Sequence, residues 1–204
     1  MENQQEHWEK IYSTKRPDEV SWTQEIPKIS LDLIHEAEPG KAAHIIDIGG
    51  GDSKLSDFLL NEGYEHISVL DISEHALLRA QQRIGEKASA IKWIQSDITD
   101  FEPSTSYDLW HDRAAFHFLT TGSQIEKYLS IARAAIKKNG IAIIGTFSTE
   151  GPKKCSGLDI HQYDEESLTK AFSKGFEKIK CVYEDHLTPF NTRQNFIFCV
   201  FKRI

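Results

Sequence analysis

The sequence predicts an α/β fold with a doubly wound, mostly parallel sheet of seven strands and an antiparallel C-terminal strand. Short β-branched runs alternate with longer amphipathic stretches from residue 44 onward, the pattern of strands joined by helices on both faces of a sheet. Two strand-like runs close the chain with no room for a helix between them, so they must pair antiparallel. That ending separates the fold from the all-parallel dinucleotide binders.

Each element follows from a local pattern of apolar residues and stop signals. Strands are expected where compact β-branched or apolar runs occur, at residues 44–48, 66–70, 91–94, 107–111, 141–147, 179–184 and 195–201. Helices are expected where apolar residues recur at a spacing of three to four, at residues 53–61, 73–83, 124–138 and 164–173. Ser73 is a predicted helix cap, and Asn139-Gly140 is a predicted helix stop.

Residues 1–40 precede the first strand and are expected to be helical, with a break around Pro17. We expect them to form a cap over the ligand edge of the sheet. This cap is predicted to be part of one domain with residues 41–204, since the length of the chain demands no second domain.

The composition is that of an ordinary globular protein, with 39% hydrophobic and 27% charged residues among 204. A chain of this length can bury enough apolar surface to need no disulfide or metal for stability. Lys and Arg total 24 against 31 Asp and Glu, which gives a formal net charge of -7. Because an acidic chain is repelled by phosphates, nucleic acid is not expected as a partner.

The cysteines Cys155, Cys181 and Cys199 lie far apart and show neither a C-x-x-C pair nor a metal-ligand spacing. This usage is typical of a reducing compartment. The first ten residues are polar, unlike a signal or transit peptide, and no stretch approaches the ~20 apolar residues of a membrane span. We therefore expect a cytoplasmic protein without a metal site and without a membrane partner.

The most informative motif is the bend at residues 47–52 (DIGGGD), where the first strand turns into a helix. Glycines in such a bend let the backbone approach a ligand closely. Bends of this kind often cradle phosphate, but Asp47 and Asp52 flank this one and would repel a diphosphate. They favour a ligand with positive charge, such as an ammonium beside a sulfonium. The nicotinamide fingerprint G-x-G-x-x-G is also incomplete, because Lys54 stands three residues after Gly51.

Acidic residues also follow the second and third predicted strands. Asp71 ends the second strand, where a carboxylate can accept hydrogen bonds from both hydroxyls of a ribose. Asp97 follows the third strand and is placed to bind an adenine amino group, with Ile72 and Ile98 packing against the ring. The alternative is that each acid only caps the helix that follows it.

The series Asp47-x-Gly49-x-Gly51, Asp71 and Asp97 resembles the class I S-adenosylmethionine-dependent methyltransferases over roughly residues 40–147. The resemblance implies a Rossmann-like fold, with S-adenosylmethionine as methyl donor and its methionine part, ribose and adenine bound in that order. The residues expected to bind the donor are Asp47, Gly49, Gly50, Gly51, Asp71, Ile72, Asp97, Ile98 and Trp22.

The stretch after the fourth predicted strand is expected on the substrate side of the ligand edge. Trp110-His111-Asp112-Arg113 resembles the W-D-R stretch of the thiopurine- and tellurite-type methyltransferases, in which the arginine lies beside the substrate. His111 departs from that pattern, which has an aromatic or apolar residue at its position. We expect His111, Asp112 and Arg113 to position or deprotonate an acceptor, with His111 as the candidate proton acceptor. The alternative for Asp112 and Arg113 is an ion pair that braces the strand end.

Aromatic residues near the N-terminus extend the resemblance to the same branch. Trp8-x-x-x-Tyr12 and Trp22 resemble regions that cover the donor there, although a lid packing on its own core explains these rings as well. The loop 151–158 is either a mobile substrate loop or an ordinary surface turn. His117 is expected to be a packing histidine rather than a base.

Two classes of methyl acceptor remain open. An enclosed pocket beneath residues 1–40 favours a small molecule, whereas the acidic balance of the chain permits a protein lysine or another protein amine. We favour a small molecule, because residues 1–40 are long enough to close the site. Outside methyl transfer, the rivals are a nicotinamide-dependent oxidoreductase and a non-catalytic protein that keeps the donor pocket.

Overall fold

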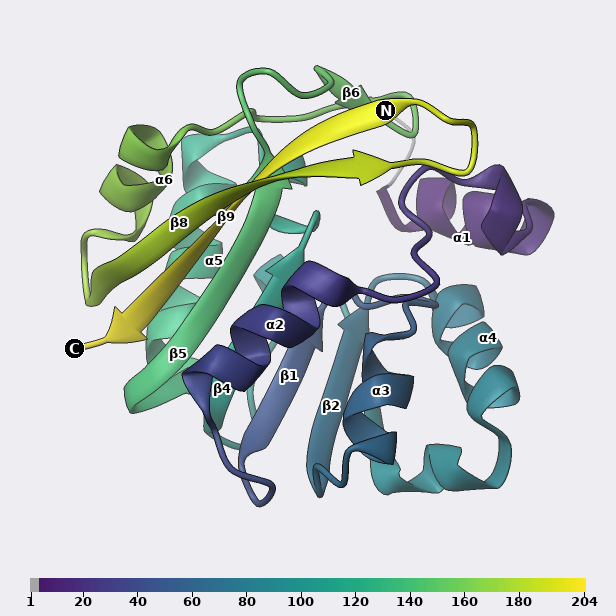
Figure 1. Cartoon of the computed structure of the whole chain (residues 1–204), viewed down its shortest axis with the longest axis horizontal. Helices are drawn as coiled ribbons and strands as arrows, with labels where there is room; N and C mark the ends of the chain where they lie inside the picture. The colour runs from purple at the N-terminus through teal and green to yellow at the C-terminus, as the bar shows by residue number, and fades with distance from the viewer. Residues whose placement is uncertain (1–3) are drawn as a thin grey trace.

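The computed structural model describes residues 4–204 and contains a seven-stranded sheet with the strand order β3-β2-β1-β4-β5-β9-β8 (Figure 1). Its strands are β1 (His44–Ile48), β2 (His66–Asp71), β3 (Ile91–Gln95), β4 (Tyr107–Arg113), β5 (Ile136–Phe147), β8 (Phe176–Leu187) and β9 (Arg193–Arg203). Neighbouring strands pair parallel except at β9, which runs antiparallel to both β5 and β8. The predicted fold class is confirmed.

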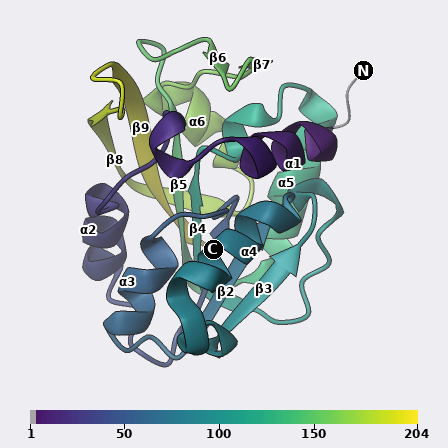
Figure 2. The same cartoon turned by 90° about the vertical axis from the view of Figure 1, so that its right-hand side faces the viewer.

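Helices cover both faces of this sheet (Figures 1 and 2). On one face lie α2 (Lys28–Ala37), α3 (Leu55–Asn61) and α4 (Glu74–Ile84), which contribute apolar residues to one core cluster. On the other face lie α5 (Gly122–Ala135) and α6 (Glu165–Phe172), which pack into a second cluster. The remaining elements are the 3-10 helices η1 (Pro17–Glu19), η2 (Gly85–Ala90), η3 (Ile98–Asp100) and η4 (Phe116–Phe118), and the short strands β6 (Lys154–Cys155) and β7 (Leu158–Asp159).

The helix starts follow the capping residues in the sequence. The Ser73 hydroxyl accepts a hydrogen bond from the backbone N–H of Ala76, as predicted for the start of α4. Thr121 and Gln124 form a reciprocal capping box at the start of α5. These bonds satisfy N–H groups that have no partner within the helix, so each helix begins at a defined residue.

The central strands send alternate side chains into the two cores, because successive residues of a strand point to opposite faces. Leu109 of β4 packs into the cluster under α2 and α3, whereas Trp110 packs into the cluster under α5. By the same alternation, His111 and Arg113 share the face of Leu109, and Asp112 shares the face of Trp110. This alternation decides which of these side chains reach the ligand edge.

Several predicted boundaries are corrected by the structure. The prediction of a helix up to residue 138 is wrong at its C-terminal end, because α5 stops at Ala135 and Ile136 pairs with Tyr107 as the first residue of β5. Strand β4 extends two residues beyond the predicted 107–111, so Asp112 and Arg113 belong to the strand itself. The two closing strands are also longer than predicted.

The N-terminal segment divides into α1 (Gln4–Thr14), η1 and α2, so the predicted break around Pro17 is confirmed. Helix α1 packs against α4 (Figure 2). Glu9 fixes this contact by accepting a hydrogen bond of 2.5 Å from the backbone N–H of Glu74, at the start of α4. Helix α2 packs on the sheet beside β4 and β5, and Ser30 in its first turn lines the ligand edge. Residues 1–3 of the predicted cap lie outside the described residues.

Cys181 of β8 and Cys199 of β9 form a disulfide, while Cys155 is free and buried. This pair is not among the predictions made from the sequence. Its two residues face each other across antiparallel strands, a relationship that spacing along the chain does not reveal.

Among residues 4–204, no group of His, Cys, Asp or Glu side chains is arranged to hold a metal ion. No helix in this described part is long and apolar enough to cross a membrane. The cytoplasmic location stays a prediction.

Candidate functional site

A cavity of about 290 Å³ lies at the carboxyl ends of β1, β2, β3 and β4, the edge at which open α/β sheets bind ligands. The structure brings eight of the nine predicted donor-binding residues to its wall: Asp47, Gly49, Gly50, Asp71, Ile72, Asp97, Ile98 and Trp22. Gly51 does not line the cavity but lies next to Tyr12 and Asp71, which do. The acids at the ends of three strands therefore converge on one space.

In the glycine bend, the backbone conformation and the close neighbours both exclude residues with a side chain. Gly49 and Gly51 have φ angles of 63° and 49°, in the left-handed region that favours glycine. A Cβ atom on Gly50 would lie 2.7 Å from the Asp47 Oδ2 atom. A Cβ on Gly51 would lie 2.8 Å from the Tyr12 hydroxyl and 3.0 Å from Asp71 Oδ2. The glycines thus allow two carboxylates and a tyrosine to approach the backbone of the bend.

Asp71 is buried at the end of β2. Its Oδ1 atom accepts a hydrogen bond of 2.8 Å from the backbone N–H of Ser73. Burial raises the pKa of Asp71 to about 7, and the nearby charges of Asp52 and Asp47 add to the rise, against the opposing hydrogen bonds from backbone N–H groups. A carboxyl with this pKa is half protonated near neutral pH and becomes a stronger hydrogen-bond acceptor as it ionises.

Asp97 both caps a helix and lines the cavity. Its Oδ1 atom accepts hydrogen bonds from the backbone N–H and the hydroxyl of Thr99, at 2.7 and 2.8 Å, which starts η3. Asp97 therefore caps the helix that follows it, as the alternative interpretation of the sequence predicts, and it also lines the cavity.

His111 connects the bend to helix α2. Its Nδ1 atom lies 2.7 Å from Asp47 Oδ1, and its Nε2 atom lies 2.8 Å from the hydroxyl of Ser30. All three side chains line the cavity. The sequence analysis does not include Ser30, because a lone serine in an amphipathic helix carries no signal before its tertiary partner is known.

Arg113 lies at the cavity wall and lacks a full set of partners. Its Nη1 atom donates a hydrogen bond of 3.0 Å to the carbonyl oxygen of Trp22, whereas Nε and Nη2 have no partner among the described residues. Burial lowers the pKa of Arg113 to about 10, and the more distant acids Glu184 and Asp47 oppose the shift. The guanidinium remains charged at neutral pH and keeps two donors free.

The structure places Asp112 away from the cavity, on the opposite face of β4 from His111 and Arg113. Asp112 accepts hydrogen bonds from the backbone N–H groups of Ala115 and Phe116 at 2.9 and 3.1 Å, and from the Tyr128 hydroxyl at 2.7 Å. Burial raises its pKa to about 6 against these hydrogen bonds. Asp112 therefore braces the turn after β4, and in residues 4–204 it forms no ion pair with Arg113.

Burial suppresses the acid–base chemistry of two further side chains, His117 and Cys155. His117 is fully buried and accepts a hydrogen bond of 3.3 Å at Nδ1 from the backbone N–H of Phe147. Burial, with the charge of Arg113, lowers its pKa to about 3, so it is a neutral packing histidine. Cys155 lines the cavity from the loop 151–158, but burial raises its pKa to about 12, so the thiol stays protonated.

Aromatic rings of the N-terminal segment form part of the cavity wall. The Trp8 ring lies 5.6 Å from the Trp22 ring and 5.2 Å from the Phe118 ring, and the Tyr12 ring lies 6.1 Å from Trp22. All four residues line the cavity. The rings thus pack on one another and face the ligand space at the same time.

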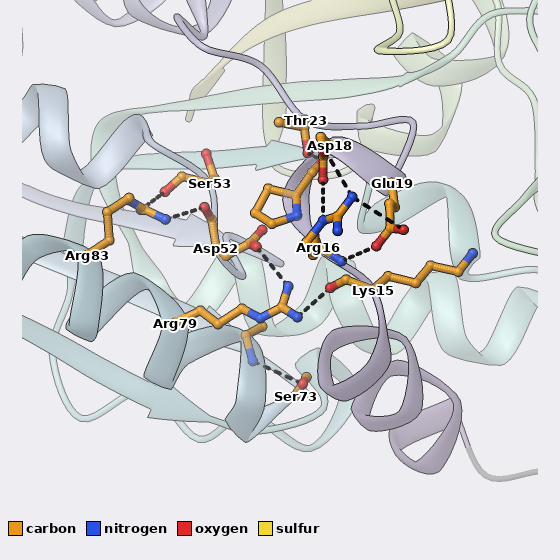
Figure 3. Close-up of polar contacts among 12 residues, drawn as sticks. Lys15, Arg16, Asp18, Glu19, Thr23, Asp52, Ser53, Ser73, Arg79 and Arg83 are labelled. Atoms are coloured by element: carbon orange, nitrogen blue, oxygen red, sulfur yellow. Dashed lines mark hydrogen bonds and ion pairs between the residues drawn. The ribbon is translucent and has the colours of Figure 1, made fainter.

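Polar contacts tie the N-terminal segment, α4 and the glycine bend together (Figure 3). Arg79 of α4 donates a hydrogen bond to the carbonyl oxygen of Lys15 and lies 3.5 Å from Asp52 Oδ2. Arg83 donates to the carbonyl oxygens of Asp52 and Ser53, each at 2.7 Å. Helix α4 therefore links the N-terminal segment to the glycine bend.

Residues 45–140 match the family described as a methyltransferase domain. This range begins with β1 and contains the glycine bend, Asp71, Asp97 and all of β4.

Curated relatives with similar sequences are methyltransferases with different acceptors. The chain is 24% identical over 169 residues to the mouse "eEF1A lysine and N-terminal methyltransferase", covering 72% of this chain and 24% of the relative. It is 32% identical over 107 residues to the malonyl-[acyl-carrier protein] O-methyltransferase of Anoxybacillus flavithermus, covering 50% and 38%. The chain spans under half the length of these relatives, so their names do not assign an acceptor here.

Solved structures share the whole fold at low sequence identity. A SAM-dependent methyltransferase from Anabaena variabilis matches with a TM-score of 0.77 at 16% identity, covering 99% of this chain and 96% of that one. The 1,6-didemethyltoxoflavin-N1-methyltransferase of Burkholderia thailandensis matches with a TM-score of 0.71 at 18% identity, covering 89% and 80%. At such identities the likeness shows the fold.

Proposed function

We propose, from the S-adenosylmethionine-dependent methyltransferase domain that this chain contains, that it transfers a methyl group to a small-molecule acceptor. One observation carries the proposal. The carboxylates Asp47, Asp71 and Asp97, from the ends of three successive strands, converge with a glycine bend on a single cavity. Relatives and structural neighbours are methyltransferases of varied acceptors, which supports the reaction class without fixing the acceptor.

The cavity fits S-adenosylmethionine better than a dinucleotide. Side chains are excluded from Gly50 and Gly51 because carboxylate oxygens of Asp47 and Asp71 lie within about 3 Å of the Cβ positions. A bend lined by carboxylates repels a diphosphate and attracts an ammonium and a sulfonium. The donor set of the wall therefore supports the methyl-donor proposal against the nicotinamide rival.

The role of each wall residue follows from its place along the cavity. We assign the ribose hydroxyls to Asp71, whose Oδ2 atom faces the bend, and the adenine amino group to Asp97, with Ile72 and Ile98 against the ring. We assign the methionine part to Asp47 and the glycine bend, together with Trp22 of the cavity wall. The proposed resemblance to the thiopurine- and tellurite-type branch is supported by the aromatic rings at the cavity wall.

On the acceptor side, we assign the positioning of the substrate to Arg113. Two of its guanidinium nitrogens have no partner within residues 4–204, and a buried cation in this state favours an acceptor that carries an oxygen lone pair or an anionic group. Bound S-adenosylmethionine supplies an electrophilic methyl group, so the chain has to align the acceptor. Orientation of this kind lowers a barrier by roughly 7–11 kcal/mol.

A protein lysine or another protein amine is the second candidate acceptor, and the mouse relative that acts on eEF1A gives it support. The cover formed by Trp8, Tyr12 and Trp22 favours a small molecule, because these rings narrow access to the cavity. A flat or extended macromolecular surface would need this cover to move aside.

Production of S-adenosylhomocysteine from S-adenosylmethionine, measured across a panel of acceptors, tests the proposal. The panel should contain small carboxylates, heteroaromatic amines, thiols and basic peptides, with S-adenosylmethionine alone as the control. We expect turnover with at least one small molecule and none above the control with the peptides. Turnover with peptides alone would favour the protein-amine candidate, and tight donor binding without turnover on any class would favour the non-catalytic rival.

A further inference from the structure

Three buried side chains from three elements form one hydrogen-bonded chain at the cavity wall. Ser30 of α2 bonds to His111 of β4, and His111 bonds to Asp47 of β1, at 2.8 and 2.7 Å. Their exposed fractions are 0%, 2% and 3%, respectively, so water does not compete for either bond. These two hydrogen bonds thus connect helix α2 directly to the glycine bend.

Both ring nitrogens of His111 are engaged by protein groups, so His111 has no nitrogen left to take a proton from an acceptor. A carboxylate can only accept, so the hydrogen bond to Asp47 requires a proton on Nδ1. With the single ring proton on Nδ1, Nε2 is the acceptor for the Ser30 hydroxyl. This arrangement replaces the role of direct base that the sequence suggests for His111.

The two oxygens of Asp47 have different surroundings. Oδ1 is held by His111, and Oδ2 faces the bend, where it would lie 2.7 Å from a Cβ atom on Gly50. A carboxylate held at one oxygen by a fixed ring keeps the other oxygen in a fixed direction. Without Ser30, the ring keeps a single hydrogen bond and gains freedom to rotate, and the carboxylate gains freedom with it.

We propose that Ser30 is a positioning residue for the methyl donor, which acts through His111 to hold Asp47 Oδ2 toward the bend. The inference rests on the proposed function, which assigns Asp47 to the methionine part of the donor. Preorganised polar groups bind a ligand without the cost of ordering themselves on binding. Ser30 belongs to the cavity lining but has no exposed surface, and its hydroxyl is bonded to His111, so the proposed effect runs through His111.

Calorimetric titration of S-adenosylhomocysteine into the full chain and its variants tests this role. We expect Ser30→Ala to weaken binding by about fivefold to twentyfold, because it removes a buried hydrogen bond and leaves Nε2 unpaired. Ser30→Thr keeps the hydroxyl and should restore most of the affinity. Ser56→Ala is the matched control, since Ser56 is equally buried on α3 but lies outside the cavity wall, and it should bind like the wild type.

A double-mutant cycle with Asp47→Asn separates action through Asp47 from other effects. If Ser30 works through Asp47, Ser30→Ala should change affinity by less than about twofold in the Asp47→Asn background. An equal loss in both backgrounds would overturn the inference, as would wild-type affinity in Ser30→Ala accompanied only by a lower melting temperature. If the wild type itself does not bind S-adenosylhomocysteine, the proposed function fails, and this inference with it.

A nitrogen-15 spectrum of the His111 imidazole in the wild type adds a test that needs no variant. The inference predicts a protonated Nδ1 and a bare, hydrogen-bonded Nε2. A ring protonated at Nε2 alone would overturn it, because Nδ1 could then donate nothing to Asp47.

Discussion

The Nη1 atom of Arg113 donates a hydrogen bond of 3.0 Å to the carbonyl oxygen of Trp22, which joins the end of β4 to the cover of the cavity. The other two nitrogens of this guanidinium have no partner among residues 4–204. One side chain therefore holds the cover in place and keeps donors free for a ligand. The effect of this side chain on stability and its effect on turnover can be measured separately.

Replacement of Arg113 by Met should leave the fold as stable as before or make it more stable. The substitution removes a buried charge that has no ion-pair partner among the described residues. We expect this gain to outweigh the loss of the hydrogen bond to Trp22 and of the guanidinium contact with the Phe196 ring. We expect an unchanged melting temperature or a rise of about 2–4 °C by circular dichroism. Turnover of an acceptor identified in the panel should fall sharply. A decrease in melting temperature of more than about 4 °C would contradict this account of Arg113.

Replacement of the neighbouring Asp112 by Ala should have the opposite effect. Asp112 accepts three hydrogen bonds, from Ala115, Phe116 and Tyr128, and its loss leaves these donors unpaired in the core. We expect the melting temperature to fall by about 4–8 °C, and the affinity for S-adenosylhomocysteine to stay within about threefold. A stable variant with greatly weakened donor binding would show that Asp112 acts in the cavity after all.

Replacement of Asp71 by Ala should weaken the binding of S-adenosylhomocysteine by at least about tenfold, because we assign charge-assisted hydrogen bonds from the ribose hydroxyls to this carboxylate. Isothermal titration calorimetry measures this loss. Asp100→Asn is a suitable control, since Asp100 is exposed, pairs with Lys127 and does not line the cavity. Equal affinity in the wild type and Asp71→Ala would remove Asp71 from the donor site.

The raised pKa of Asp71 predicts a pH dependence of donor binding. In the free protein this pKa is about 7, and ribose hydroxyls that donate to the ionised carboxylate lower it in the complex. Binding near neutral pH therefore releases a proton, and affinity should rise from about pH 6 to about pH 8 and then level off. Calorimetry in buffers of different ionisation enthalpy counts the proton. A flat profile, or one that Asp71→Asn leaves unchanged, would contradict the assignment.

Replacement of Arg79 by Met should loosen the cover of the cavity. Arg79 joins the Lys15 carbonyl to Asp52, so its loss removes one of the links between the N-terminal segment and the bend (Figure 3). We expect S-adenosylhomocysteine to dissociate about three to ten times faster in stopped-flow fluorescence, with Trp8 and Trp22 as the reporters. The exposed Arg193→Met is the control. An unchanged dissociation rate in Arg79→Met would show that the cover does not limit release.

The residues that reach the cavity from the ends of β1, β2 and β3 could be predicted from the sequence, because their signals are local. The glycine bend and Asp71 each stand at the end of a recognisable strand, and parallel strands bring their carboxyl ends to one edge. Ser73 likewise predicts the start of α4, because serine is favoured as a helix N-cap. In these cases a short stretch of sequence determines both the element and the place of its last residue.

The surroundings of the residues from β4 depend on relationships that no short stretch contains. The length of β4 decides that Asp112 points into the opposite core, and two additional residues of pairing with β5 determine that length. Ser30 reaches His111 across 81 positions, and the disulfide of Cys181 and Cys199 depends on strand register. Tertiary packing, and not local preference, fixes each of these.

Calorimetric titration of the wild-type chain with S-adenosylhomocysteine and, separately, with NADH tests the central claim most directly. A bend lined by carboxylates should bind the homocysteine nucleoside and give no heat of binding with the dinucleotide. Saturable binding of NADH by a protein that gives no heat with S-adenosylhomocysteine would contradict the assignment of the cavity to a methyl donor.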